Sequence, residues 1–188
     1  MHGSYEERIL HLCETYYEAV YRFLYHFVGN RCDAEDITQE VFIRVLEALP
    51  RYDGRVQIKT WIFSIAKHVA IDQYRRKKFR RILSTIWFND IPATDGLPEV
   101  VFLEKERDQQ LRNVILKLPQ KYRMVIILRS MEACSVKETA EILGVSEAKV
   151  KVDYHRALKL IQKKISEAEE EGGGKTCAGK TKISYIKE

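Results

Sequence analysis

Residues 135–165 read SVKETAEILGVSEAKVKVDYHRALKLIQKKI, and this stretch predicts two helices joined by a tight turn. Ser135 and Glu138 have the spacing of a capping box, in which the hydroxyl accepts from the third backbone amide and the carboxylate reaches back. Gly144 can supply the turn, and Ser146 is a suitable N-cap for the helix that follows. The stretch therefore indicates a helix-turn-helix.

The second helix of this pair separates into two faces when it is projected at about 100° per residue. The apolar face is predicted to pack in a core and holds Val150, Tyr154, Ala157, Leu158, Ile161 and Ile165. The opposite face is mostly cationic and holds Lys149, Lys151, Val152, His155, Arg156, Lys159 and Lys163. Such a helix can enter the DNA major groove, with its N-terminal half on base edges and its lysines on phosphates. A solvated helix packed on a neighbour is the alternative.

Two acidic residues of the same helix, Glu147 and Asp153, are expected to repel phosphate. Glu147 at the helix start also favours the helix dipole, and it can accept a hydrogen bond from a cytosine amino group.

The rest of the chain also predicts helices, because its 4 prolines interrupt no long periodic segment and no alternating apolar and polar run indicates a sheet. Helices are predicted over 5–28, 33–49 and 60–81, and a further helical set begins near Glu104, with breaks at Pro119, near Ala133 and at Gly144. The predicted fold is all-α, with two small helical domains joined by a flexible linker. The predicted segments are a first domain 5–81, a linker 82–103, a helix-turn-helix domain 104–166 and a flexible tail 167–188.

Charge is distributed unevenly along the predicted first domain. Residues 1–50 hold nine acidic and four basic side chains, a net charge of −5, whereas residues 51–81 hold ten basic and two acidic, a net charge of +8. A basic patch this localised favours a polyanionic partner. Its aromatic neighbour Trp61 would suit stacking on single-stranded or distorted DNA, although a core position is the commoner role of a helix tryptophan.

The predicted helix 33–49 also has two distinct faces. Its core face holds Ile37, Val41, Phe42, Val45, Leu46 and Leu49, and its outer face holds Asp36, Gln39, Glu40, Ile43 and Glu47. An isoleucine in the middle of an acidic surface favours a protein interface.

Several classes of site and location receive no support from the sequence. The 4 cysteines form no ligand pair, so no zinc site and no cofactor are predicted. No apolar run is long enough to span a membrane and no signal peptide is evident, so we expect a cytoplasmic protein without membrane insertion. Residues 174–181 satisfy the P-loop pattern GxxxxGK[ST], but they lack the preceding strand and following helix that a nucleotide site needs.

The segment Asp33-Ala34-Glu35-Asp36-Ile37-Thr38-Gln39-Glu40-Val41-Phe42 resembles the polymerase-binding helix of bacterial RNA polymerase sigma factors. The segment from Thr60-Trp61-Ile62-Phe63 to Arg75-Arg76 resembles the promoter-binding segment that follows it in that family. Leu118-Pro119-Gln120-Lys121-Tyr122-Arg123 and the helix-turn-helix resemble the family's second domain. The order of these segments over about residues 10–165, with two domains only, is similar to the extracytoplasmic-function (ECF) subfamily.

The resemblance implies a non-enzymatic subunit that binds core RNA polymerase through the β′ clamp helices and the β flap, recognises promoter DNA at its −10 and −35 elements and assists promoter opening. It also implies an anti-sigma factor as a further partner, often a membrane-bound one. The implied contacts are Asp36, Gln39, Glu40, Phe42 and Ile43 with the polymerase; Lys59, Thr60, Trp61, Lys67, His68, Arg75 and Arg76 with the −10 element; and Lys149, Lys151, Val152, His155, Arg156 and Lys159 with the −35 element. His68 stands where the family often has asparagine.

Two other classes of protein compete with this interpretation. An ordinary helix-turn-helix regulator would account for residues 135–165 but not for the acidic face of residues 33–47 or the separate basic helix. A helical adaptor that binds only proteins would leave both cationic helices without a role. An enzyme is least favoured, since no paired carboxylates, nucleophile set or metal spacing stands out.

Overall fold

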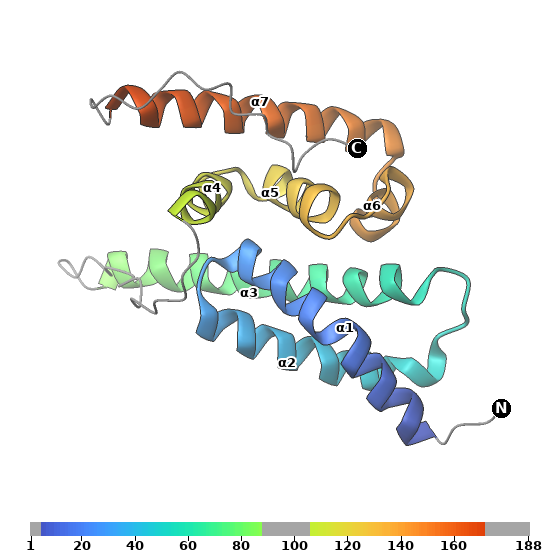
Figure 1. Cartoon of the computed structure of the whole chain (residues 1–188). Coiled ribbons are helices and arrows are strands. Elements are labelled where there is room, and N and C mark those ends of the chain that lie inside the picture. Colours follow the sequence, from blue (N-terminus) through green and yellow to red (C-terminus); the bar gives the residue numbers. More distant parts are fainter. Residues whose placement is uncertain (1–4, 88–105, 172–188) are drawn as a thin grey trace. The chain divides into compact units, whose positions relative to one another are not determined.

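The computed structural model describes residues 5–87 and 106–171, and the chain divides into two compact units, Met1–Arg107 and Asp108–Glu188. Within the described ranges every regular element is a helix and no strand is present. The predicted all-α class with two helical domains is therefore confirmed. Figure 1 shows the helices along the chain.

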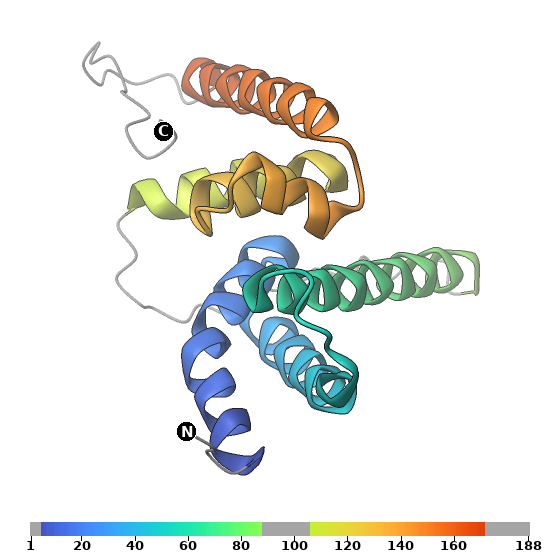
Figure 2. The same cartoon turned by 90° about the vertical axis from the view of Figure 1, so that its right-hand side faces the viewer.

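The first unit is built from three long helices, each of which contacts the other two. Figure 2 shows α1 crossing the α2–α3 pair. The chain reverses between α1 and α2 at Gly29, whose φ of 89° suits glycine, and the Asn30 side chain caps α2 by accepting from the backbone amide of Asp33. The elements are α1 (Tyr5–Val28), α2 (Arg31–Ala48), the 3-10 turn η1 (Leu49–Arg51) and α3 (Ile58–Trp87).

Aromatic and aliphatic side chains from all three helices form the core of this unit. Phe23 of α1 meets Phe63 of α3 edge to face, with ring centroids 5.4 Å apart, and Phe27 approaches Tyr74 at 6.1 Å. The predicted core face of α2 is buried at Ile37, Val41, Phe42, Val45 and Leu49. The buried α3 residues are Ile62, Phe63, Ala66, Val69 and Ala70.

Helix α3 is longer than the sequence indicated. It runs from Ile58 to Trp87, so residues 82–87, predicted as the start of the linker, are helical. The reason is local, because no proline or glycine occurs between Arg81 and Trp87 to end the helix. The remaining residues of the predicted linker that precede Glu104 lie outside the described ranges.

The second unit contains α4 (Glu106–Leu116), α5 (Gln120–Ile126), the π-helical segment η2 (Ile127–Met131), α6 (Val136–Leu143) and α7 (Glu147–Glu171). The three predicted breaks are confirmed. Pro119 is the N-cap residue of α5, Ala133 takes a positive φ of 51° between η2 and α6, and Gly144 ends α6.

The helix-turn-helix has the capping predicted for it. The Ser135 hydroxyl accepts from the Glu138 amide at 3.1 Å, and the Glu138 carboxylate accepts from the Ser135 amide at 2.6 Å. Gly144 is left-handed, with φ 68° and ψ 40°, and the Ser146 hydroxyl accepts from the Lys149 amide at 3.3 Å. Buried Val125, Ala140 and Val150 join α5, α6 and α7 behind the turn.

The predicted tail 167–188 begins as helix, because α7 continues to Glu171. Its last residues are glutamates and an alanine, which are strong helix formers. Residues 172–188, with the P-loop match at 174–181 and Cys177, lie outside the described ranges.

Replacing Gly144 by alanine is expected to destabilise the second unit by about 1–2 kcal/mol, the usual cost of a left-handed residue with a Cβ. A Cβ at this position would meet no atom within 4 Å, so the loss comes from backbone strain and not from a clash. Urea unfolding followed by circular dichroism measures it. Gly144→Asn is the matched control and should lose less, because asparagine tolerates this conformation. Wild-type stability in Gly144→Ala would contradict the account.

Candidate nucleic-acid and protein interfaces

The outer face of α2 combines acidic groups with one large apolar side chain. Asp36, Gln39 and Glu47 are exposed, and Ile43 among them is 57% exposed. An aliphatic side chain held open to solvent within an acidic surface is typical of a protein interface.

Phe42 does not belong to this outer face. It is buried, and its ring lies 5.5 Å from that of Tyr17 on α1. Its burial agrees with the core face predicted from the helical period, and the polymerase contact that the family resemblance implies for Phe42 stays a prediction.

A set of polar contacts, here called the α2–α3 seam, ties the acidic helix to the basic one. Glu40 accepts from Gln73 of α3 at 3.0 Å and from Arg44 of its own helix at 2.5 Å. Asp33 forms an ion pair with Lys77 of α3. Sequence reasoning missed Gln73 and Lys77, and no local pattern could have paired residues so far apart in the chain.

The seam changes the ionisation of both carboxyls. Burial acts to raise the pKa of Asp33, but hydrogen bonds from Lys77 and Asn30 outweigh it and the pKa is lowered. Burial likewise acts to raise the pKa of Glu40, and hydrogen bonds from Gln73 and Arg44 with the charge of Arg76 lower it. Both groups are therefore held in the charged form in the folded state.

The cationic part of α3 is exposed to solvent from Arg75 to Arg80. All six residues from Arg75 to Arg80 are exposed, and Phe79 among them is 62% exposed. His68, about two turns before Arg75, is also exposed. Phe79 was not singled out from the sequence, although an aromatic residue within a run of bases was a visible signal.

Four other predicted −10 residues lie nearer the core. Thr60 and Lys67 are buried, and burial lowers the pKa of the Lys67 ammonium. Lys59 is half-buried over the Phe63 ring, 5.9 Å from its centroid, and half-buried Trp61 contacts Tyr52 at 4.9 Å. The side chains of Thr60 and Lys67 face inward in this structure, and their contact with the −10 element stays a prediction.

The exposed face of α7 matches its predicted composition. The inward residues Val150, Ala157 and Ile161 are buried, whereas the opposite residues are all exposed: Lys149, Lys151, Val152, His155, Arg156, Lys159 and Lys163. Asp153 differs from expectation, because it is buried and its carboxylate binds the Lys149 ammonium at 2.9 Å. It therefore does not repel phosphate at the outer face, and it holds Lys149 back toward its own helix.

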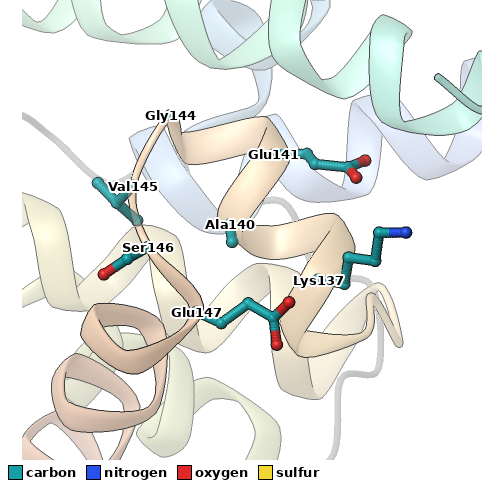
Figure 3. Close-up of a pocket in the computed structure, with 7 residues that line it drawn as sticks. All are labelled: Lys137, Ala140, Glu141, Gly144, Val145, Ser146 and Glu147. Atoms are coloured by element: carbon teal, nitrogen blue, oxygen red, sulfur yellow. The ribbon is translucent and has the colours of Figure 1, made fainter. Parts of the chain in front are cut away.

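Where α6 meets α7 there is an open hollow around the turn (Figure 3), lined by Lys137, Ala140, Glu141, Gly144, Val145, Ser146 and Glu147. Figure 3 shows Lys137 and Glu147 extending from the two helices on either side of the turn. Glu147 is exposed at the start of α7, as the sequence predicted.

Within the described ranges no group of three or more His, Cys, Asp or Glu residues could hold a metal ion. None of the helices in the described ranges is long and apolar enough to cross a membrane. The described cysteines, Cys13, Cys32 and Cys134, are not joined in disulfides.

Both units match families of known proteins. The family model of Sigma-70 region 2 matches residues 12–80, and that of Sigma-70, region 4 matches residues 108–161. The ECF RNA polymerase sigma factor SigX of Bacillus subtilis (strain 168) is 37% identical over 170 residues, covering 88% of this chain and 88% of SigX. The ECF RNA polymerase sigma factor SigW of the same strain is 32% identical over 162 residues, covering 82% of this chain and 87% of SigW.

Solved structures share the fold. The sigma factor RpoE, in complex with the anti-sigma factor NepR from Bartonella quintana, superposes with a TM-score of 0.69 at 18% identity, covering 85% of this chain and 98% of that one. CnrH, in complex with the cytosolic domain of CnrY, gives a TM-score of 0.65 at 20% identity, covering 86% of this chain and 90% of that one.

An acidic helix beside a basic one, followed by a helix-turn-helix with a cationic outer face, defines a DNA-binding transcription protein. With both sigma regions and its relatives, the chain belongs to the ECF RNA polymerase sigma factors. It acts in transcription initiation, where it partners core RNA polymerase and recognises promoter DNA.

The seam predicts an acid-sensitive contribution to the stability of the first unit. The folded state lowers the pKa of both Asp33 and Glu40. The stabilisation that results is fully present at a pH above the pKa of an ordinary carboxyl group. It is lost as the pH falls through the lowered pKa of each group in the folded state. Asp33→Asn should lower the free energy of unfolding at neutral pH and flatten its decline toward about pH 3.

Urea unfolding at a series of pH values measures this effect. Lys77→Met removes the partner of Asp33 and should flatten the decline in the same way, and adding Asp33→Asn to it should change little more. An unchanged pH dependence in both single variants would show that the pair does not stabilise the fold.

Proposed function

We propose that this ECF sigma factor has three binding surfaces. The outer face of α2 binds core polymerase, the exposed part of α3 binds the −10 element, and the outer face of α7 binds the −35 element. The observation that carries this proposal is the α7 face, where every buried position is apolar or internally paired and the cations lie outside. Its exposed side chains Lys151, Val152, His155, Arg156 and Lys159 are assigned to −35 DNA, and Lys149, held by Asp153, is assigned to nearby phosphate.

The polymerase-binding assignment rests on charge and shape. Asp36, Gln39 and Ile43 are exposed on α2 and Glu40 is partly so, which suits a partner surface that is basic and partly apolar. Phe42 is assigned a supporting role from the core. The resemblance to the family points to the β′ clamp helices for this face and to the β flap for the second domain.

The −10 assignment separates contact residues from positioning residues. His68, Arg75 and Arg76 are exposed and can reach bases or phosphates, with Lys59 and Trp61 at the edge of the surface. Thr60 and Lys67 are buried and are assigned a positioning role. Neutralising phosphates along a basic helix is the main source of such affinity.

We assign polymerase and −10 binding to residues 5–81, −35 binding to residues 104–166, a connecting role to residues 82–103 and no essential role in initiation to residues 172–188. The protein acts without catalysing a reaction itself and works in the cytoplasm, where its polymerase acts. The sigma factor RpoE, which has the same fold, forms a complex with the anti-sigma factor NepR, and this supports an anti-sigma partner for this chain as well.

Polymerase binding is tested on residues that take no part in the seam. Asp36→Arg with Ile43→Asp should abolish co-purification with core polymerase, because it reverses a charge and places a second one where an apolar contact is expected. Glu14→Arg, an exposed charge reversal on α1, is the matched control and should bind as the wild type does. Undiminished binding by the double variant would remove α2 from the interface.

The −35 assignment is tested by the dependence on DNA sequence. In the reconstituted holoenzyme, Arg156→Ala should reduce the preference for an intact over a scrambled −35 element by about 1–3 kcal/mol, as the loss of a base contact does. Lys163→Ala, further along the same face, should weaken binding to the intact and the scrambled −35 element by the same factor. An Arg156→Ala holoenzyme that keeps the full preference would show that this residue does not contact bases.

A further inference from the structure

The centre line of the DNA-facing side of α7 is apolar near the start of the helix. Residues nine positions apart lie on opposite sides of an α-helix, since a turn takes 3.6 residues. Val152 is therefore directly opposite buried Ile161, and Ala148 is directly opposite buried Ala157. Both Ala148 and Val152 are exposed, Val152 to 47%, and at four positions apart they form one short stripe.

Cations flank this stripe. Lys151 and His155 are exposed on one side of it and Arg156 on the other, while Lys159 continues the centre line about two turns beyond Val152. The one acidic residue of these turns, Asp153, is buried in its pair with Lys149. The stripe is therefore a small apolar strip with cationic borders, which suits DNA better than an apolar protein partner.

The position of the stripe determines which part of the DNA it would meet. When a recognition helix lies in the major groove, side chains on its centre line point at base edges, and side chains on its flanks reach the phosphates. The only apolar group that base pairs present in the major groove is the 5-methyl group of thymine. Valine and alanine carry no hydrogen-bonding group, so they can recognise a base edge only through such a contact.

We propose that Val152, supported by Ala148, recognises the 5-methyl group of a thymine in the −35 element and so acts as a specificity-determining residue. This inference rests on the proposed placement of α7 at the −35 element. It adds a defined preference: a T·A pair must occupy the position opposite the stripe, on one strand or the other. The flanking Lys151 supplies affinity, Arg156 contacts another base, and the stripe supplies discrimination at its own base pair.

Deoxyuridine tests the contact directly, because it pairs as thymine does and lacks only the methyl group. The holoenzyme is assembled from core polymerase and the full chain, and its binding is measured on a promoter from which it initiates. Each thymine of the −35 element, on either strand, is replaced in turn. At one position the substitution should weaken binding about fourfold, the loss expected for one buried methyl-sized group.

Variants link that loss to the side chain. The Val152→Ala holoenzyme should bind promoters with thymine or deoxyuridine at the sensitive position almost equally. The Lys151→Ala holoenzyme should bind both promoters more weakly, with the ratio of the two affinities unchanged. Both residues are exposed, so neither change disturbs the core. If no deoxyuridine substitution matters, or if Val152→Ala keeps the full ratio, the proposed contact is overturned. If scrambling the whole −35 element has no effect on the wild type, the placement of α7 itself fails.

Discussion

The packing of α2 against α3 is the constraint on which the first unit depends. Val41 and Val45 of one helix and Ile62 and Ala66 of the other are fully buried, so both helices must present their charged residues outward. The outer face of α2 is acidic and the distal part of α3 is basic, and the seam of Asp33 with Lys77 and Glu40 with Gln73 joins them at the edge. Two surfaces for chemically opposite partners are thereby fixed within one small domain.

In the second unit, burial of one face of α7 likewise determines which residues of that helix are exposed. Val150, Ala157 and Ile161 anchor α7 against its neighbours, and the capping of Ser135 and the left-handed Gly144 fix the angle at which it follows α6. Burial of these residues determines which face of α7 packs inward, and it therefore also determines which residues are exposed on the opposite face. DNA is not needed to orient the helix in this way. The pairing of Lys149 with Asp153 then removes the one acidic group of the middle turns from that face.

Much of this arrangement could be predicted because it depends on local signals. The capping box, the breaks at Pro119 and Gly144 and the buried positions of α7 follow from spacing and periodicity alone. The sequence predicts an end of α3 at Arg81, before the segment with two prolines and Gly96, but nothing from Ile82 onward stops the helix before Trp87. The burial of Asp153 and Lys67 and the contact of Glu40 with Gln73 could not be predicted, since they depend on neighbours that only the folded chain brings together.

The central claim, that these surfaces serve promoter-directed initiation, is tested most directly by transcription in vitro. Purified core polymerase would be supplied with genomic DNA fragments, with and without this protein, and transcript starts would be mapped. The account predicts new discrete start sites preceded by a shared −35 and −10 pair. An absence of new starts, with core polymerase from the same organism shown to be active through another sigma factor, would contradict it.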